Sequence, residues 1–227
     1  EGVEIKGQGA VGLVTYIRTD SVRVSKEAQQ AALDIIRERY GEAYAPKTPN
    51  IYKGRKNAQD AHEAIRPTYP ERTPDSVKAS LTPDQFKLYR LIYNRFFASQ
   101  MTPAQYETIT VTLAAEKPGL TDQYTFRAAG SRLLFDGYSA VYTESRDDGG
   151  EEKETKLPAI DEGDVFACTN FAKEQHFTQP PLRYTEASLV RELEEKGIGR
   201  PSTFSPTITT IIERGYVKRE KRVLYPT

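Results

Sequence analysis

The chain has 227 residues, with 32 basic and 32 acidic side chains, so its formal net charge is zero. A protein that coats DNA is usually basic, and the balanced total argues against that class unless one basic face is hidden in the sum. No apolar run approaches the ~20 residues of a membrane-spanning helix, and no apolar leader is visible. The single cysteine, Cys168, excludes an intrachain disulfide and a multi-cysteine zinc site within the chain, which suits a reducing cytoplasm. Because the chain starts with Glu1 and not with Met, we expect a piece of a longer protein.

The first zone, residues 1–102, has the pattern of a mixed and mostly helical region. The β-branched, apolar run at residues 11–17 predicts a buried strand. Ser25 is a suitable cap for a helix that reaches about Tyr40 and carries alanines and isoleucines on one face.

The rest of this zone contains a loop at 41–57, a helical turn at 58–65 that Pro67 stops, and a second long helix. The sequence Thr-Pro-Asp-Gln at 82–85 predicts the start of that helix, because it supplies a cap, a proline in the first turn and a capping-box glutamine. We expect the helix to run to about Ser99 and to bury Leu88, Leu91, Ile92 and Phe96.

The second zone, residues 103–178, has the pattern of β-structure. Threonines alternate with apolar residues at 108–113, which is the period of a half-buried strand. The acidic, glycine-containing stretch at 145–154 predicts a mobile loop. Further strands are expected near 124–129, 137–143 and 164–171.

The third zone is helical again. Thr185 can cap a helix that ends at Gly197, and a Ser-Pro pair at 205–206 can open a second helix that ends at Gly215. The basic stretch at 216–225 predicts a small hairpin. The order helix, turn, helix and hairpin is typical of a winged helix.

Tyr16 and Arg18 would project from the same face of an extended segment. A phenol is a poor nucleophile at neutral pH, but a guanidinium beside it can favour the phenolate and hold a phosphate in a two-pronged contact. Phosphoryl transfer needs mainly positioning and stabilisation of charge, so the pair is a candidate for that chemistry.

His62 and Arg66, four residues apart on the expected helical turn, would share a face and could both reach phosphate. The alternative is that His62 is a structural residue satisfied by Asp60 or Glu63.

A glycine-rich turn at 197–203 places Arg200 and the hydroxyls of Ser202 and Thr203 near the start of a helix, where backbone N–H groups also suit phosphate. The turn is not a Walker A loop, because no Lys-Ser or Lys-Thr follows the glycines. The sequence has no Asp-x-Asp-x-Glu cluster and no His-x-x-x-His pair, so we expect no metal site within the chain.

Four blocks of the sequence, in this order, resemble the type IA DNA topoisomerases, and bacterial topoisomerase I in particular. They are GLVTYIRTDS at 12–21, DAHEAIRPT at 60–68, HFTQPP with EASLV at 176–190, and GIGRPSTF at 197–204. The resemblance covers nearly the whole chain.

The resemblance implies that Tyr16 attacks a phosphodiester of single-stranded DNA and forms a 5′-phosphotyrosine, with Arg18 stabilising the phosphate and His62 assisting near the backbone. A second strand would pass through the break, and resealing would relax negatively supercoiled DNA without ATP. We expect a monomer in the cytoplasm, at the nucleoid and on no membrane. Residues expected to contact DNA are Thr19, Asp20, Arg66, Arg200, Ser202 and Thr203.

The implied fold is α+β and multidomain. Residues 1–102 would form a helical, winged-helix-like catalytic-tyrosine domain, 103–178 part of an antiparallel β arch, and 179–227 part of a winged-helix-like domain that binds single-stranded DNA. The Toprim domain of the family, with its acidic Mg²⁺ cluster, is expected upstream. We therefore expect Mg²⁺ to serve the parent enzyme and the chain alone to be inactive in relaxation.

Other functions fit parts of the pattern. Tyrosine recombinases also make a phosphotyrosine, but they carry the tyrosine late in the chain after His-x-x-Arg, whereas Tyr16 comes early and the spacing is His-x-x-x-Arg. A non-catalytic winged-helix DNA-binding protein would have Tyr16 in its core and would prefer duplex DNA. A structural gate segment is the third alternative.

Overall fold

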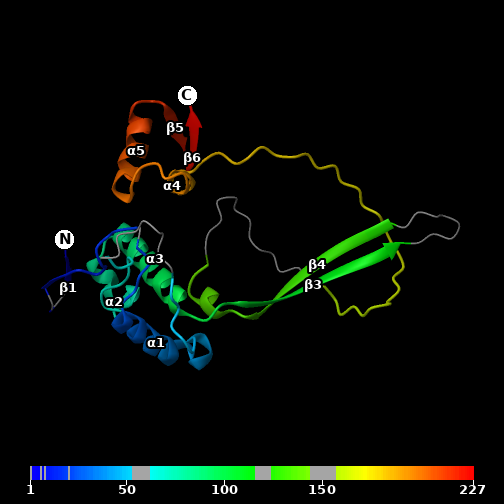
Figure 1. Cartoon of the computed structure of the whole chain (residues 1–227), viewed down its shortest axis with the longest axis horizontal. Coiled ribbons are helices and arrows are strands. Elements are labelled where there is room, and N and C mark those ends of the chain that lie inside the picture. Colours follow the sequence, from blue (N-terminus) through cyan, green and yellow to red (C-terminus); the bar gives the residue numbers. More distant parts are fainter. Residues whose placement is uncertain are drawn as a thin grey trace. The chain divides into compact units, whose positions relative to one another are not determined.

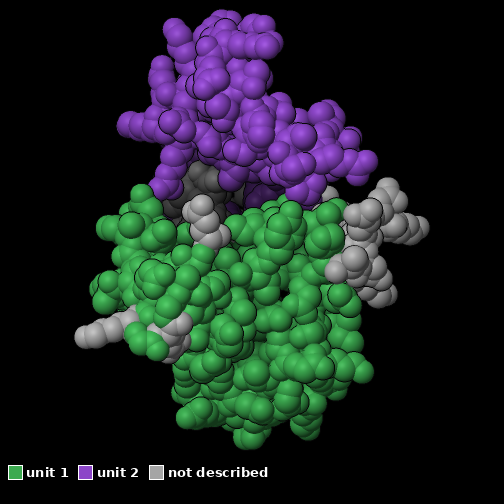
Figure 2. Space-filling model, turned by 90° about the vertical axis from the view of Figure 1, so that its left-hand side faces the viewer, with its two compact units in different colours: residues 1–105, 134–144 green, residues 106–133, 145–227 purple. Residues whose placement is uncertain are grey.

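The computed structural model describes residues 2–5, 7, 9–19, 21–52, 62–115, 124–143 and 157–227. The chain divides into two compact units, Glu1–Gln105 with Leu134–Glu144, and Tyr106–Leu133 with Ser145–Thr227 (Figure 2). The predicted mixture of helices and small sheets is confirmed. The division into three domains at residues 102 and 178 stays a prediction.

Helix α1 (Lys26–Tyr40) forms where the cap pattern predicted it (Figure 1). The Ser25 side chain accepts a hydrogen bond from the N–H of Ala28, and the helix ends at Gly41, whose N–H donates to the Arg37 carbonyl. The face that α1 buries is formed by Ala28, Ala32, Leu33 and Ile36.

Helix α3 (Pro83–Gln100) also begins as predicted, with a complete capping box between Thr82 and Gln85. Its expected inward face was wrong: Leu88 and Leu91 are about half exposed, while Phe96 is buried as predicted. The helix is apolar on several sides, so its packing against α1 and α2 (Pro74–Val77) decides which side faces inward. That side is aromatic and includes Tyr89, Tyr93, Phe96 and Phe97.

The core of the first unit lies between α1 and α3 and also takes in Leu13 and Met101. Short elements complete the unit: β1 (Val3–Ile5) pairs antiparallel with β2 (Gly9–Val11), and single turns of 3₁₀-helix lie at η1 (Glu42–Tyr44) and η2 (Lys78–Ser80).

The buried strand predicted at 11–17 was wrong. Strand β2 ends at Val11, and beyond it only Val14 forms a bridge, with Pro67. Tyr16 and Ile17 are exposed, because the chain leaves the core after the buried Leu13.

A two-stranded sheet joins β3 (Gln105–Ala115) and β4 (Tyr124–Phe135), which confirms the strands predicted around residues 108–113 and 124–129. The strand predicted at 137–143 is instead a 3₁₀ turn, η3 (Gly137–Ala140). Gly137 has a φ of +48°, and a Cβ there would lie 2.4 Å from the Thr102 carbonyl oxygen, so the position requires glycine.

Residues 164–171, predicted as a strand, have no regular secondary structure and are exposed. A strand needs a neighbouring strand, and the structure gives this segment none among the described residues. The mobile loop predicted at 145–154 lies outside the described residues.

At the C-terminal end, α4 (Glu186–Glu195) and α5 (Pro201–Glu213) are followed by the antiparallel hairpin of β5 (Val217–Glu220) and β6 (Val223–Pro226). Thr185 caps α4 as predicted. Helix α5 begins earlier than the Ser-Pro pair suggested, because Pro201 occupies its first turn and Pro206 is tolerated inside it. Among the described residues, no helix has both the length and the apolar character needed to cross a membrane.

Candidate active site

Tyr16 follows a short stretch of chain that is paired with a distant segment. The N–H of Thr15 donates to the Arg66 carbonyl at 3.0 Å, and the N–H of Thr68 donates to the Leu13 carbonyl at 3.0 Å. With the bridge between residues 14 and 67, residues 13–15 therefore run antiparallel to residues 66–68.

The chain after Tyr16 returns to the same segment. The hydroxyl of Ser21 donates to the His62 carbonyl at 2.6 Å, and the N–H of Ala64 donates to the Arg23 carbonyl at 2.7 Å. The segment at 62–68 thus contacts the chain both before and after Tyr16.

Thr15 strengthens this closure through its side chain. Its hydroxyl donates to the Ala64 carbonyl at 2.8 Å and accepts from the N–H of Arg66 at 3.0 Å. The loop at 16–19 is consequently fixed at both of its ends on one short segment, which limits the positions that Tyr16 can adopt.

Tyr16 is 75% exposed, and its ring centroid lies 5.9 Å from that of His62, with an angle of 34° between the planes. The Nδ1 atom of His62 is buried and has no hydrogen-bond partner in the described part of the chain. The alternative in which Glu63 satisfies this nitrogen is wrong, because Nδ1 has no such bond and the Glu63 carboxylate accepts from Ser25 and Arg66 instead. Asp60 lies outside the described residues.

The helical turn predicted at 58–65 was wrong for residues 62–65, which form no helix; the earlier residues of that range lie outside the described part. The structure does bring His62 and Arg66 onto one segment, but not by a helical spacing. Arg66 binds the Glu63 carboxylate through Nε at 3.1 Å and Nη2 at 2.7 Å, and its Nη1 donates to the Pro67 carbonyl at 3.0 Å. Its side chain is 13% exposed.

Arg18 is partly buried and Thr19 is exposed, two and three residues beyond Tyr16. Asp20 lies outside the described residues. The roles of these residues, and a contact of Arg66 with DNA, stay predictions.

The second group of predicted residues lies at the start of α5, in the second unit. The N–H of Arg200 donates to the Thr203 hydroxyl at 2.8 Å, and that hydroxyl donates to the Arg200 carbonyl at 3.0 Å. Thr203 is therefore a local cap of the helix. The side chains of Arg200 and Ser202 are exposed.

Comparison with known proteins identifies the family. A family model described as DNA topoisomerase matches residues 9–227, which is nearly the whole chain. The chain belongs to the bacterial type IA DNA topoisomerases.

A solved structure agrees with this family. Full-length topoisomerase I from Thermotoga maritima matches this topoisomerase chain with a TM-score of 0.74 and 37% sequence identity. The match covers 100% of this chain and 34% of the other, so this chain spans about a third of that relative's length.

A Mg²⁺ site would need several carboxylate or similar side chains close together. Within the described ranges, no three His, Cys, Asp or Glu residues lie close enough together to hold a metal ion. Glu63, the carboxylate nearest in sequence to His62, already accepts from Arg66 and from the Ser25 N–H. Both Glu63 carboxylate oxygens therefore already accept hydrogen bonds from neighbouring groups.

Sequence reasoning gave Thr15 and Ser21 no role in the site, and it considered Glu63 only as a partner of His62. Each acts through a contact 38 to 51 residues away along the chain, which local patterns do not reveal. The one available signal was the spacing of Glu63 and Arg66, which suits an ion pair.

Proposed function

We propose that this chain supplies the DNA-cleaving tyrosine of a type IA topoisomerase. The Tyr16 phenol oxygen attacks a phosphodiester of single-stranded DNA, an O–P bond forms, and the bond from phosphorus to the 3′-oxygen breaks. The phenol loses its proton and the departing 3′-oxygen gains one, which leaves a 5′-phosphotyrosine and a free 3′-hydroxyl. The observation that carries this proposal is that Tyr16 is 75% exposed on a loop held at both ends.

Two neighbours are assigned to this reaction. Arg18, two residues from Tyr16, binds the phosphate and stabilises the charge of the transition state. His62, whose ring lies beside that of Tyr16, assists at the DNA backbone. The proposal for His62 is supported by the position of its ring beside the exposed Tyr16.

The complete cycle follows from the chemistry of the covalent link. A phosphotyrosine conserves the energy of the broken phosphodiester, so the 3′-hydroxyl can reseal the strand without ATP after another strand has passed. Release of strain in negatively supercoiled DNA drives the cycle. We assign the working protein to a monomer at the bacterial nucleoid, with any Mg²⁺ bound outside the residues described here.

The C-terminal part of the chain is assigned to holding single-stranded DNA. The order α4, α5 and hairpin supports a winged-helix-like fold there. Arg200 and Ser202 are exposed at the start of α5, where a cation and a hydroxyl suit a phosphate, and Thr203 shapes that turn. Residues 103–178 would form part of the hinge between this region and the catalytic-tyrosine domain.

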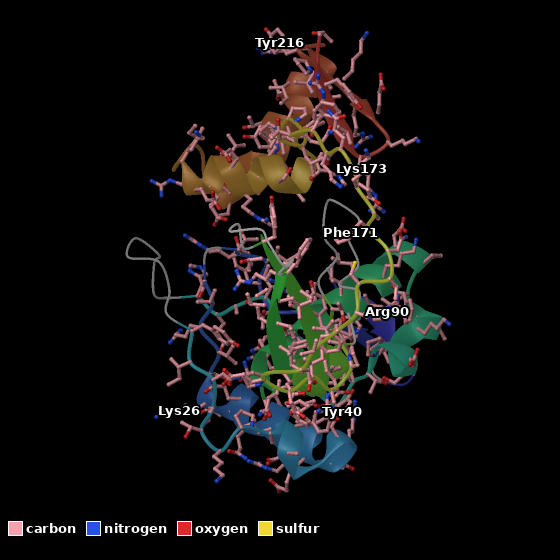
Figure 3. All side chains as sticks on the ribbon, turned by 90° about the vertical axis from the view of Figure 1, so that its right-hand side faces the viewer. Lys26, Tyr40, Arg90, Phe171, Lys173 and Tyr216 are labelled. Carbon is pink, nitrogen blue, oxygen red and sulfur yellow. The ribbon has the colours of Figure 1, made fainter. Side chains whose placement is uncertain are left out.

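The test is formation of covalent protein–DNA adduct by the complete gene product that carries this sequence. Tyr16→Phe removes one oxygen and is expected to abolish adduct, because no nucleophile remains, while the fold persists. Tyr40→Phe is the matched control: Tyr40 is 39% exposed at the end of α1 in the same unit (Figure 3). Adduct in Tyr16→Phe, or its loss in Tyr40→Phe, would contradict the proposal.

A second candidate function is a non-catalytic DNA-binding or structural gate module, which the helix–helix–hairpin order of residues 185–226 favours. Equilibrium binding separates the two. The topoisomerase proposal predicts salt-sensitive binding that prefers single strands, whereas a reader of duplex DNA prefers a double-stranded sequence. We also expect the 227-residue chain alone to relax no plasmid.

A further inference from the structure

Glu63 occupies the middle of the segment that closes the Tyr16 loop. Its neighbours in sequence make the closing contacts: the His62 carbonyl accepts from Ser21, and Ala64 bonds to both Thr15 and Arg23. Its own side chain points to different partners. The Glu63 carboxylate can therefore set where this whole segment lies.

The carboxylate receives three hydrogen bonds. One oxygen accepts from the N–H of Ser25 at 3.0 Å, and the other accepts from Nε and Nη2 of Arg66 at 3.1 and 2.7 Å. The two side chains are only 25% and 13% exposed. A charged pair that is largely removed from water and bonded on both sides is rigid, and removing one partner leaves the other charge without compensation.

Ser25 connects this pair to the core of the first unit. It is the cap residue of α1, whose other face is buried against α3, and a helix N-terminus favours a negative charge. A continuous set of contacts thus runs from α1 through Glu63 to His62 and the Tyr16 loop. In contrast, no hydrogen bond, ion pair or ring contact among the described residues joins the Glu63 or Arg66 side chain to Tyr16.

We infer that Glu63 and Arg66 form a positioning pair that fixes His62 and the Tyr16 loop on the start of α1, and that Arg66 acts through Glu63 and not through DNA phosphate. This inference rests on the proposed function of Tyr16. It makes Glu63 a positioning residue for strand cleavage. Loss of the pair lets the segment shift, and a displacement of about 1 Å can reduce a rate by on the order of 100-fold.

The test compares variants of the complete gene product at saturating single-stranded DNA. Glu63→Gln and Arg66→Gln should each lower the rate of covalent adduct formation about tenfold or more, with the Kd for DNA changed less than twofold. The double variant should be no slower than the slower single variant, since both changes break one interaction. Asp34→Asn, which removes an exposed, ion-paired carboxylate on α1, is the matched control and should keep the normal rate.

The salt dependence of DNA binding separates the two possible roles of Arg66. A positioning role leaves the slope of log Kd against log salt unchanged in Arg66→Gln. A phosphate contact would lower that slope by about one and weaken binding, and this result would overturn the inference. Additive losses in the double variant, or a normal adduct rate in Glu63→Gln, would overturn it as well.

Two further variants keep the test decisive. Arg66→Lys retains a cation and one bond to Glu63, so it should fold even if Glu63→Gln does not; its adduct rate should fall several-fold with an unchanged salt slope. A normal rate of adduct formation in Arg66→Lys would contradict the positioning role of the pair. Tyr16→Phe is measured alongside: adduct in that variant refutes the proposed function, whereas its absence together with a normal Glu63→Gln refutes only the positioning pair.

Discussion

The core of the first unit and the loop at 16–19 both carry tyrosine, but in opposite surroundings. Tyr89 and Tyr93 are 3% and 6% exposed, and their hydroxyls donate to the Arg72 and Pro70 carbonyls at 2.7 and 2.8 Å. Burial raises the pKa of Tyr89 to about 12 and also raises that of Tyr93. Tyr16, by comparison, is 75% exposed.

The difference shows that one residue type occupies two opposite environments in the same unit. In the core, the ring is packed and the hydroxyl is used up by a backbone carbonyl, so the tyrosine contributes stability and cannot react. In the loop, the backbone is held by Thr15 and Ser21 while the ring stays outside. The core also supports the loop. Ser25, the cap residue of α1, donates a hydrogen bond to Glu63 in the segment on which the loop closes.

The largest effect that would sharpen this comparison is expected from Arg18→Lys. Lysine keeps the charge but loses the two-pronged phosphate contact, so adduct formation should fall about 100-fold, with little change in stability. Adduct yield and the unfolding midpoint of the same preparation measure the two quantities. Near-normal cleavage would argue against the role assigned to Arg18.

A core tyrosine should behave in the opposite way. Tyr93→Phe removes the bond to Pro70 and the one that Arg39 donates to the Tyr93 hydroxyl at 3.0 Å. Leaving the buried carbonyl without a partner should lower the free energy of unfolding by about 1–3 kcal/mol, and adduct formed per folded molecule should not change. Tyr52→Phe, which loses one bond from an exposed tyrosine to the Ser99 carbonyl, is the control and should cost less. Equal costs in a urea titration would contradict the comparison.

The smallest effect appears only in alkaline solution. Burial, with a smaller contribution from Tyr93, raises the pKa of Tyr89 in the folded chain to about 12 from an ordinary value of 10.0. Because the folded state holds this proton more tightly, the associated stability is complete below pH 10 and is lost as the pH rises toward 12. The unfolding midpoint of Tyr89→Phe should fall less steeply over that range than that of the wild type. Identical slopes would show that Tyr89 does not contribute.

Local sequence signals predicted the capped helices well, failed for residues 62–65, and predicted the strands unevenly. Ser25 and Thr82 mark helix starts because caps act within one turn, and both proved correct. The strand expected at 137–143 failed because Gly137 lies close against the Thr102 carbonyl, a contact across 35 residues that periodicity cannot detect. The buried face of α3 was predicted wrongly for a similar reason. Several sides of the helix are apolar, and its contacts with neighbouring helices determine which side is buried.

The sequence suggested candidate residues for the site but did not predict how the surrounding segments pair. Tyr16 and His62 were selected from two separate blocks of the sequence, and the structure places their rings side by side. A helix was expected at 58–65, whereas residues 62–68 pair with the chain on both sides of Tyr16. Such pairing depends on partners that are distant in sequence, so local patterns do not predict it. Glu63 was noticed only as a possible partner of His62, whereas it binds Arg66 and Ser25.

The most direct measurement is to identify the residue that carries DNA in the trapped covalent complex. The complete gene product is incubated with a single-stranded oligonucleotide, denatured, digested with protease and nuclease, and the modified peptide is sequenced by mass spectrometry. The account predicts a phosphate link on Tyr16 and on no other of the 14 tyrosines. A link on any other residue, with Tyr16 unmodified, would contradict it.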